Sequence, residues 1–313
     1  MGFRIKLAVS GVIAALLLTR IDAAAVVAAL GGLAPGPALA AAALFLLTHV
    51  VNAAKLRVLM PERPLGTLLA YTLLAQAYAL LLPGQVAGEA VKAYRLGRGR
   101  GTQGGQAVSS VVFDKLTGIA GVLVLTLLGI AAEPGRFGGS LAWAAAAGLF
   151  GLAAAAAALS CGPLVRRLPA ALSGRAGARL APVLGHSFSH FLGHFLDTWR
   201  AHAGRPGRLA LSLGYGVASQ AVAVAGSQML GRALGIEIGF ALWCVVIGAL
   251  TVVLLAPLTI GGIGLREASL VGLLGVLGVA PEQALALALA VFAFQILVAL
   301  LGLLVDLTVL RKA

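Results

Sequence analysis

Charged residues are scarce in this sequence. Asp, Glu, Lys and Arg make up 11% of the 313 residues, whereas hydrophobic residues make up 60% and the mean hydropathy is +1.03. A soluble domain with this composition would not stay in solution, which indicates an integral membrane protein. Spanning segments must pair their own backbone N–H and C=O groups, and the long Ala, Leu and Val runs lack the alternation of barrel strands. The sequence therefore predicts an all-α, polytopic membrane protein.

The residue sets that mark several other functions are missing. The two cysteines, Cys161 and Cys244, form no metal-spaced set. His186, His190 and His194 recur at helical spacing, but a solvated polar face is favoured over a metal site, so no metal or cofactor is expected. No nucleotide-binding loop and no module of aromatic and basic residues is present, so ATP and nucleic acid are not expected as partners.

The net charge is +13, and the basic residues gather in short stretches between apolar segments, which is typical of positive-inside topology. Windows of about 20 residues, enough for a bilayer core of roughly 30 Å, give candidate spans near 7–31, 37–54, 66–82, 105–131, 140–160, 209–230, 240–260 and 284–310. Basic clusters lie at 4–6, 55–63, 92–100, 162–208 and 311–312. These clusters, and with them both termini, are expected on the cytoplasmic side.

The charge pattern conflicts with simple crossing in the first half of the chain. The clusters at 55–63 and 92–100 are both predicted to be cytoplasmic, yet a single apolar segment, 66–82, lies between them. One crossing cannot return to the same side. The pattern therefore predicts a re-entrant hairpin over 66–95.

The same conflict in the second half predicts a second re-entrant hairpin over 240–279. Each half then contains span, span, hairpin and span, and an odd number of full spans inserts the halves with opposite orientation, as in many secondary transporters. The prediction is one domain of about six full transmembrane helices plus two re-entrant helical hairpins, an inverted repeat with halves at 1–131 and 140–313. Ten ordinary helices are the alternative. The segment 162–208 is predicted to carry an amphipathic helix in the cytoplasmic interface.

A charge at membrane depth costs about a few kcal/mol, so it suggests a function by default. The first such group follows Pro83. If the chain after this turn is helical, one polar stripe contains Gln85, Gly88, Glu89, Lys92 and Arg95. The stripe has an internal Glu89–Lys92 pair and presents cations to an anion from the cytoplasm. An interfacial helix with solvated charges is the alternative.

A second group, Asp114 and Lys115, lies inside an apolar run. Adjacent helical residues point about 100° apart, so these two are not expected to pair with each other. Asp114 is expected to pair with Lys92 or Arg95, and Lys115 with Glu89. The alternative is a position near the cytoplasmic end of the span, with Lys115 reaching to the interface.

A third group breaks a helix at four residues: Pro257, Gly261, Gly262 and Gly264. The next helix is predicted to begin near Leu265, which leaves unpaired N–H groups and a positive dipole end at the turn. With Arg266 in the first turn, the arrangement resembles a phosphate cradle. The alternative is a kinked helix with a structural Arg266–Glu267 pair.

These segments together resemble the lysylphosphatidylglycerol synthase transmembrane-region family, also called flippase-like domain proteins. The resemblance is carried by P-G-Q-V-A-G-E-A-V-K-A-Y-R at 83–95, V-S-S-V-V-F-D-K-L at 108–116 and P-L-T-I-G-G-I-G-L-R-E-A-S-L at 257–270. It covers nearly the whole chain. Lys92 and the Asp114–Lys115 pair stand where the family pattern has an arginine and a Glu-Arg pair. The sign of each charge is kept, but the two parallel hydrogen bonds that an arginine guanidinium can donate are lost.

The resemblance implies a domain that moves lipids across the bacterial cytoplasmic, or inner, membrane. Some members are fused to a soluble aminoacyl-transferase domain; here only three residues follow Leu310, so a transporter rather than an enzyme is expected. The expected function is a lipid translocase, or flippase, for a lipid with an anionic or phosphate-bearing headgroup. The alternatives are a membrane-embedded headgroup transferase with Glu89 or Asp114 as base, and a noncatalytic membrane partner of a separate lipid-modifying synthase.

Overall fold

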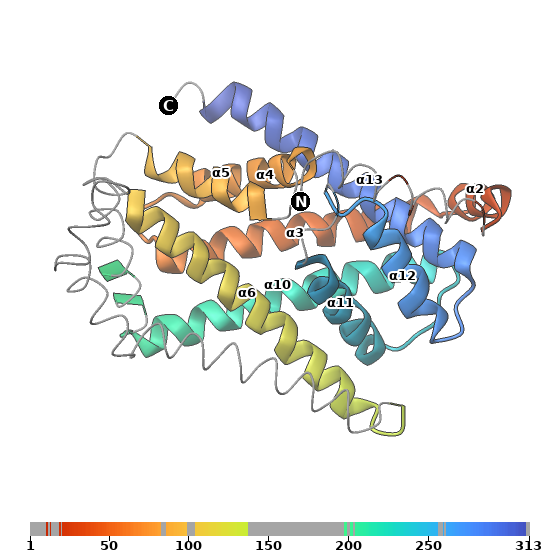
Figure 1. Cartoon of the computed structure of the whole chain (residues 1–313). Helices are drawn as coiled ribbons and strands as arrows, with labels where there is room; N and C mark the ends of the chain where they lie inside the picture. Colours follow the sequence, from red (N-terminus) through yellow and green to blue (C-terminus); the bar gives the residue numbers. More distant parts are fainter. Residues whose placement is uncertain are drawn as a thin grey trace, which may run out of the picture.

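A computed structural model describes residues 21–82, 86–98, 104–136, 201–202, 204–255, 259 and 261–310, with isolated residues at 11, 13, 19, 197 and 198. All regular structure in these residues is helical (Figure 1), as the sequence predicted. The helices are α2 (Ala23–Gly31), α3 (Pro35–Leu59), α4 (Leu65–Leu81), α5 (Val86–Gly97), α6 (Gly104–Ala132), α10 (Pro206–Ala233), α11 (Phe240–Leu255), α12 (Leu265–Gly275), α13 (Pro281–Val305) and the π-helical turn η2 (Asp306–Leu310).

Four of these helices are long and apolar enough to cross a membrane: α3, α6, α10 and α13 with the start of η2. The 25 residues of α3 extend over about 37 Å, against a hydrocarbon core of roughly 30 Å. The chain is therefore a helical membrane protein with at least these four candidate spans. Within the predicted span at 7–31, the described end forms a separate helix, α2, which begins at Ala23 and is capped by Asp22. The predicted span at 140–160 and most of the predicted interfacial segment 162–208 lie outside the described residues.

Besides α2 and η2, the other described helices are shorter and come in two consecutive pairs. The apolar helices α4 and α11 have 17 and 16 residues, or about 25 Å, and α5 and α12 have 12 and 11, or about 17 Å. Each pair follows one long helix and precedes another. The order long, short, short, long therefore occurs twice, as α3 to α6 and as α10 to α13.

Proline fixes where three of the long helices begin. Pro35, Pro206 and Pro281 occupy the first helical turn of α3, α10 and α13. The first N–H groups of a helix have no intrahelical acceptor, so the missing N–H of proline costs nothing there and its restricted φ favours the helix. The spans predicted from the sequence begin two to three residues later than these helices do in the structure.

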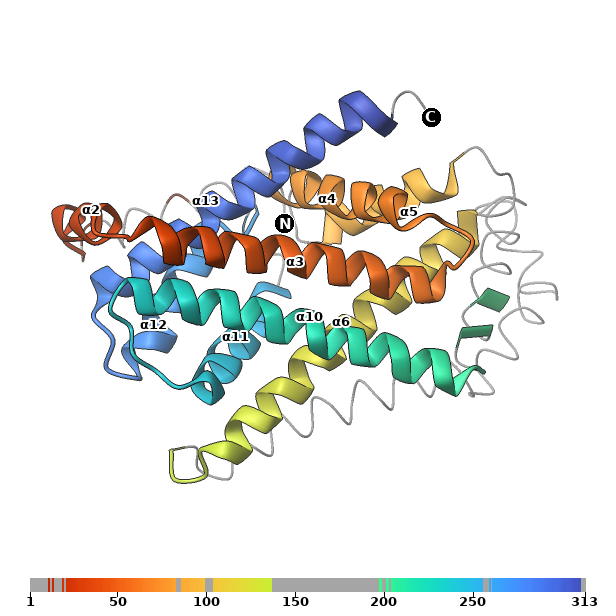
Figure 2. The same ribbon diagram turned by 180° about the vertical axis from the view of Figure 1, so that it is seen from behind.

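The two sets of four helices pack on each other in an exchanged pattern. The long helices α3 and α10 lie side by side along the bundle (Figure 2), and Gly226 near the end of α10 faces Phe45 in the first half of α3, so the two are antiparallel. The short helix α4 packs on α13, and its counterpart α11 packs on α6. A glycine allows each approach: Gly302 of α13 contacts the backbone of α4, and Gly129 of α6 contacts that of α11.

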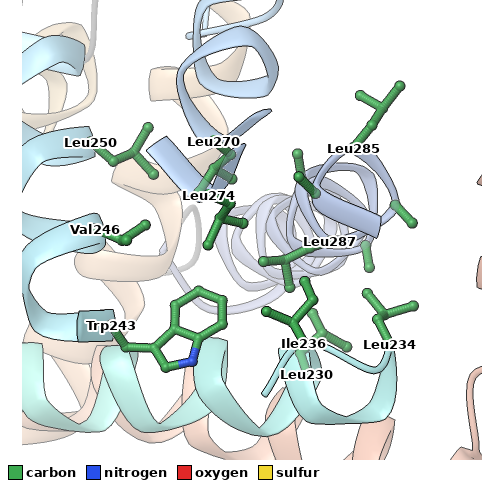
Figure 3. Packing of buried hydrophobic residues seen from close by; sticks show 14 of the residues in the cluster. Leu230, Leu234, Ile236, Trp243, Val246, Leu250, Leu270, Leu274, Leu285 and Leu287 are labelled. Carbon is green, nitrogen blue, oxygen red and sulfur yellow. The ribbon is translucent and has the colours of Figure 1, made fainter. Parts of the chain in front are cut away.

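Two apolar clusters occupy opposite ends of the bundle. The larger surrounds Trp243 and includes Leu230, Leu274 and Leu287, from α10 to α13 (Figure 3). The smaller joins α3, α4, α5 and α6 through residues such as Leu56 and Leu96. Four of the buried charged residues, Lys55, Lys92, Asp114 and Arg266, line one cavity.

Candidate functional site

A polar cavity of about 280 Å³ lies where the two sets of helices meet. Each of α3, α4, α5, α6, α10, α11, α12 and α13 contributes to its wall. Its charged lining consists of Lys55, Glu89, Lys92, Asp114, Lys115 and Arg266. Because each water occupies about 30 Å³ of the liquid, the volume equals that of roughly nine waters. This space suits a headgroup-sized ligand and is too small for a complete lipid.

The helix α5 brings Glu89 and Lys92 to the cavity as the spacing predicted. Gly88 allows this approach, because a Cβ at this position would overlap the carbonyl oxygen of Ala75 in α4. The Lys92 Nζ lies 2.5 Å from Glu89 Oε2, and only 3% of the Lys92 side chain is exposed. The predicted Glu89–Lys92 pair is therefore present.

Asp114 of α6 joins two lysines from different helices. Its Oδ2 lies 3.6 Å from Lys92 Nζ and its Oδ1 lies 3.4 Å from Lys55 Nζ. Lys55 also donates a 2.8 Å hydrogen bond to the backbone carbonyl of Asp114. A continuous series of charges, Glu89, Lys92, Asp114 and Lys55, thus connects α5, α6 and α3.

The position of Lys55 differs from the sequence interpretation, which grouped it with the cytoplasmic cluster at 55–63. The helix α3 continues to Leu59, five residues beyond the predicted end of its span. Lys55 therefore lies more than a turn inside the helix and is buried. Opposite it, Gly118 leaves the room that its ammonium fills, since a Cβ there would lie 3.0 Å from Lys55 Nζ.

The glycine-rich turn before α12 places Arg266 in the cavity wall. Gly261, Gly262 and Gly264 have φ values of 60°, 79° and 84°, which side chains with a Cβ rarely adopt. Arg266 donates from Nη2 to the carbonyl of Gly261 at 3.0 Å, and its guanidinium carbon lies 5.6 Å from the centre of the Phe292 ring. Its Nη1 is buried with no hydrogen-bond partner among the described residues. This donor remains available to a ligand.

Glu267 has a structural role. Its carboxylate accepts a 2.6 Å hydrogen bond from the backbone N–H of Gly264, so it caps the start of α12. Among the described residues no ion pair joins Arg266 to Glu267. The cap occupies one of the N–H groups that the sequence interpretation left unpaired.

The predicted site residues do not all lie in the cavity wall. Those that line the cavity are Gly88, Glu89, Lys92, Asp114, Lys115, Gly261 and Arg266. Arg95 instead pairs with Asp306 of η2 through Nη1 and Oδ1 at 3.3 Å. Gly262 and Gly264 shape the turn, and Pro83, Gln85 and Pro257 lie outside the described residues. In the described part of the chain no ion pair joins Lys115 to Glu89, although both line the same wall.

Several uncharged polar residues in the wall were not selected from the sequence. They are His49, Asn52, Thr72, Gln76, Gln220, Thr251 and Gln295. The signal that could have found them is a polar side chain within an apolar helix, since each such group costs free energy unless it is paired or faces a cavity. Together with the net charge of about +2 from four basic side chains and two carboxylates, they make the cavity suited to a polar anion.

Comparison with known proteins agrees with the motifs. The family model described as Lysylphosphatidylglycerol synthase TM region matches residues 4–302, which confirms the resemblance predicted from the sequence. No curated protein and no solved structure gives a significant match to the chain.

Proposed function

Because the chain belongs to the lysylphosphatidylglycerol synthase transmembrane-region family, we propose that it is a lipid translocase. Its substrate is a lipid with an anionic or phosphate-bearing headgroup, and it acts in the bacterial cytoplasmic membrane. The observation that carries this proposal is the position of the cavity. A polar, net positive space in the middle of an apolar bundle is where a headgroup would cross the hydrocarbon core.

The two pairs of short helices are the proposed re-entrant hairpins of an inverted repeat. None of α4, α5, α11 and α12 spans 30 Å, as their lengths above indicate. The tips of the two pairs meet, because a Cβ on Gly261 would lie 3.1 Å from the carbonyl oxygen of Leu80, and both of these residues line the cavity. Interrupted helices that meet at a central binding site are typical of transporters with inverted repeats.

The end of the bundle that holds the smaller apolar cluster is the proposed cytoplasmic end. Exposed basic residues occur near the turns there, including Arg57, Arg98 and Arg205, as the positive-inside rule requires. The end of α13 lies at the same end, since Arg95 contacts Asp306. The carboxyl terminus is accordingly proposed to be cytoplasmic.

The cavity residues suggest how a headgroup is held. A buried anion is stable only when it is paired, and the unpartnered Arg266 Nη1 and the ammonium of Lys115 offer that pairing. Lys92 contacts both Glu89 and Asp114. It can therefore release one carboxylate to bind a phosphate while the other carboxylate still compensates its charge. The acyl chains stay outside, because the cavity is too small for them.

The translocase proposal is tested with the purified full chain in phosphatidylcholine vesicles that contain a small fraction of phosphatidylglycerol with a fluorescent acyl chain. A reducing agent added outside bleaches outer-leaflet label, so transport appears as loss of the inner-leaflet signal. We expect protein-dependent loss that is faster than for a labelled phosphatidylcholine. No loss beyond that of protein-free vesicles would contradict the proposal, and a lipid of changed mass would indicate the transferase instead.

The hairpin arrangement predicts that the two ends of the first short pair lie on one side of the membrane. Glu62 precedes α4 and Arg98 follows α5, and both are exposed. With Cys161 and Cys244 replaced, Glu62→Cys and Arg98→Cys should both react with an impermeant thiol reagent only from the cytoplasmic side. Labelling from opposite sides would mean that this pair crosses the membrane once. The periplasmic-side reference is an exposed position in the α10–α11 turn, Glu237→Cys.

A further inference from the structure

An apolar groove of about 620 Å³ lies between α5 and α6, beside the polar cavity. Its walls are formed by small and aliphatic side chains such as Ala90, Ala93, Val108 and Val111. Two of its lining residues, Glu89 and Lys115, also line the central cavity. The groove and the cavity therefore share a boundary, polar on one side and apolar on the other.

The groove is open at the outer surface of the bundle. Tyr94 of α5 and Val112 of α6 line it, and these residues are 63% and 37% exposed. In a membrane-embedded bundle such apolar surface faces acyl chains rather than water. From Glu89 to Gly97 the groove follows α5 over eight residue steps, or about 12 Å. It is thus an elongated apolar channel that runs from the charged boundary toward the α5–α6 turn.

We propose that this groove holds one acyl chain of the transported lipid while its anionic headgroup lies in the central cavity. The inference rests on the proposed translocase function and names the route by which the lipid enters. The occupant follows from the two chemistries that meet at the boundary: Lys115 suits a phosphate, and the alanine and valine walls suit a hydrocarbon chain. The cavity alone has less than half the volume of the groove, so the chain has to leave the cavity, and the groove is an apolar exit that adjoins it.

The groove is tested by filling it. Val112→Trp places a bulky side chain on the groove wall, and Leu128→Trp is the matched control because Leu128 is a 60% exposed residue of the same helix away from the groove. We expect Val112→Trp to slow movement of long-chain fluorescent phosphatidylglycerol at least about tenfold and Leu128→Trp to leave it unchanged. Both variants should bind glycerol 1-phosphate, which has no acyl chain, as the wild type does.

The outcomes separate the groove from the translocase itself. Normal transport by a folded Val112→Trp would overturn the proposal that the groove holds an acyl chain, and would leave the proposed translocase function intact. No transport by the wild type would overturn the proposed function, and the groove with it. Slow transport by both tryptophan variants would show that the effect is not specific to the groove wall, and would also overturn the proposal that the groove holds an acyl chain.

A photochemical measurement covers the case in which Val112→Trp fails to fold. The wild type is irradiated in vesicles that contain phosphatidylglycerol with a diazirine midway along one acyl chain, and labelled peptides are identified by mass spectrometry. We expect label on residues 104–116 in excess of label around Leu128, and loss of that excess in Lys115→Gln. Label spread equally over both regions of α6 would indicate annular lipid only and would overturn the proposal.

Discussion

Replacing Arg266 with glutamine is expected to slow lipid movement at least about tenfold and to leave the protein folded. Arg266 is a buried cation of the cavity whose Nη1 has no hydrogen-bond partner in the described part of the chain, while Nη2 donates to the carbonyl of Gly261. Glutamine keeps a donor for that carbonyl but removes the charge. Loss of one charged hydrogen bond to a phosphate is worth about 1.5–3 kcal/mol, which corresponds to a transport rate at least about tenfold lower in the vesicle assay.

Three further variants serve as controls for this result. Arg57→Gln removes an exposed arginine of α3 outside the cavity and should transport normally. Arg266→Lys keeps the charge but loses the planar fork, so intermediate transport is expected. Wild-type rates in a folded protein with both Arg266→Gln and Lys92→Gln would refute the cavity as the headgroup path. Thermal unfolding in detergent checks that each variant is folded.

Local sequence was sufficient to predict the parts of the site that depend on helical spacing. Glu89 and Lys92 are three residues apart on one helix, so their pairing follows from the repeat of the α-helix. The cost of leaving charges unpaired at membrane depth predicted a partner for Asp114 in the stripe, Lys92 or Arg95, and the structure shows that it is Lys92. The spans of α3, α6, α10 and α13 follow from hydropathy, with errors of a few residues at their ends.

Other parts depend on contacts that no local pattern contains. Lys55 lies at the edge of an apolar run, where lysines usually reach the interface, and only the continuation of α3 to Leu59 shows that it is buried. Arg95 continues the polar stripe of α5, yet its partner Asp306 is 211 residues away in sequence. The contribution of Gln220 and Gln295 requires knowing that α10 and α13 both face the cavity.

The pairing of Arg95 with Asp306 also divides the predicted stripe into two functions. Glu89 and Lys92 face the cavity, whereas Arg95, one turn further along α5, fastens the first short pair to the end of α13. The α4 helix contacts α13 and η2 as well. One end of the α4–α5 pair is thus held to the last long helix, while Leu80 near its other end meets the glycine turn before α12.

The second large effect is expected from Asp114→Asn, which should destabilise the fold itself. Asp114 compensates two lysines that are each 3% exposed, and for Lys55 it provides the carboxylate of the ion pair. Breaking a buried ion pair by removing one partner costs about 3–5 kcal/mol, because a charge is left uncompensated. A clear fall in the midpoint of thermal unfolding in detergent is the expected measurement.

This explanation is tested by removing one of the two lysines in addition to the Asp114 carboxylate. Lys55→Met in the Asp114→Asn background removes the stranded charge and keeps a linear apolar side chain in its place, so most of the lost stability should return. Lys92→Met in the same background should not restore it, because Lys92 is also the partner of Glu89 at 2.5 Å and its removal strands that carboxylate. Equal recovery with both changes, or a wild-type midpoint for Asp114→Asn alone, would contradict the arrangement of charges from Glu89 to Lys55. The energy of the Lys55–Asp114 contact itself follows from the double-mutant cycle of Lys55→Met, Asp114→Asn and the two changes together.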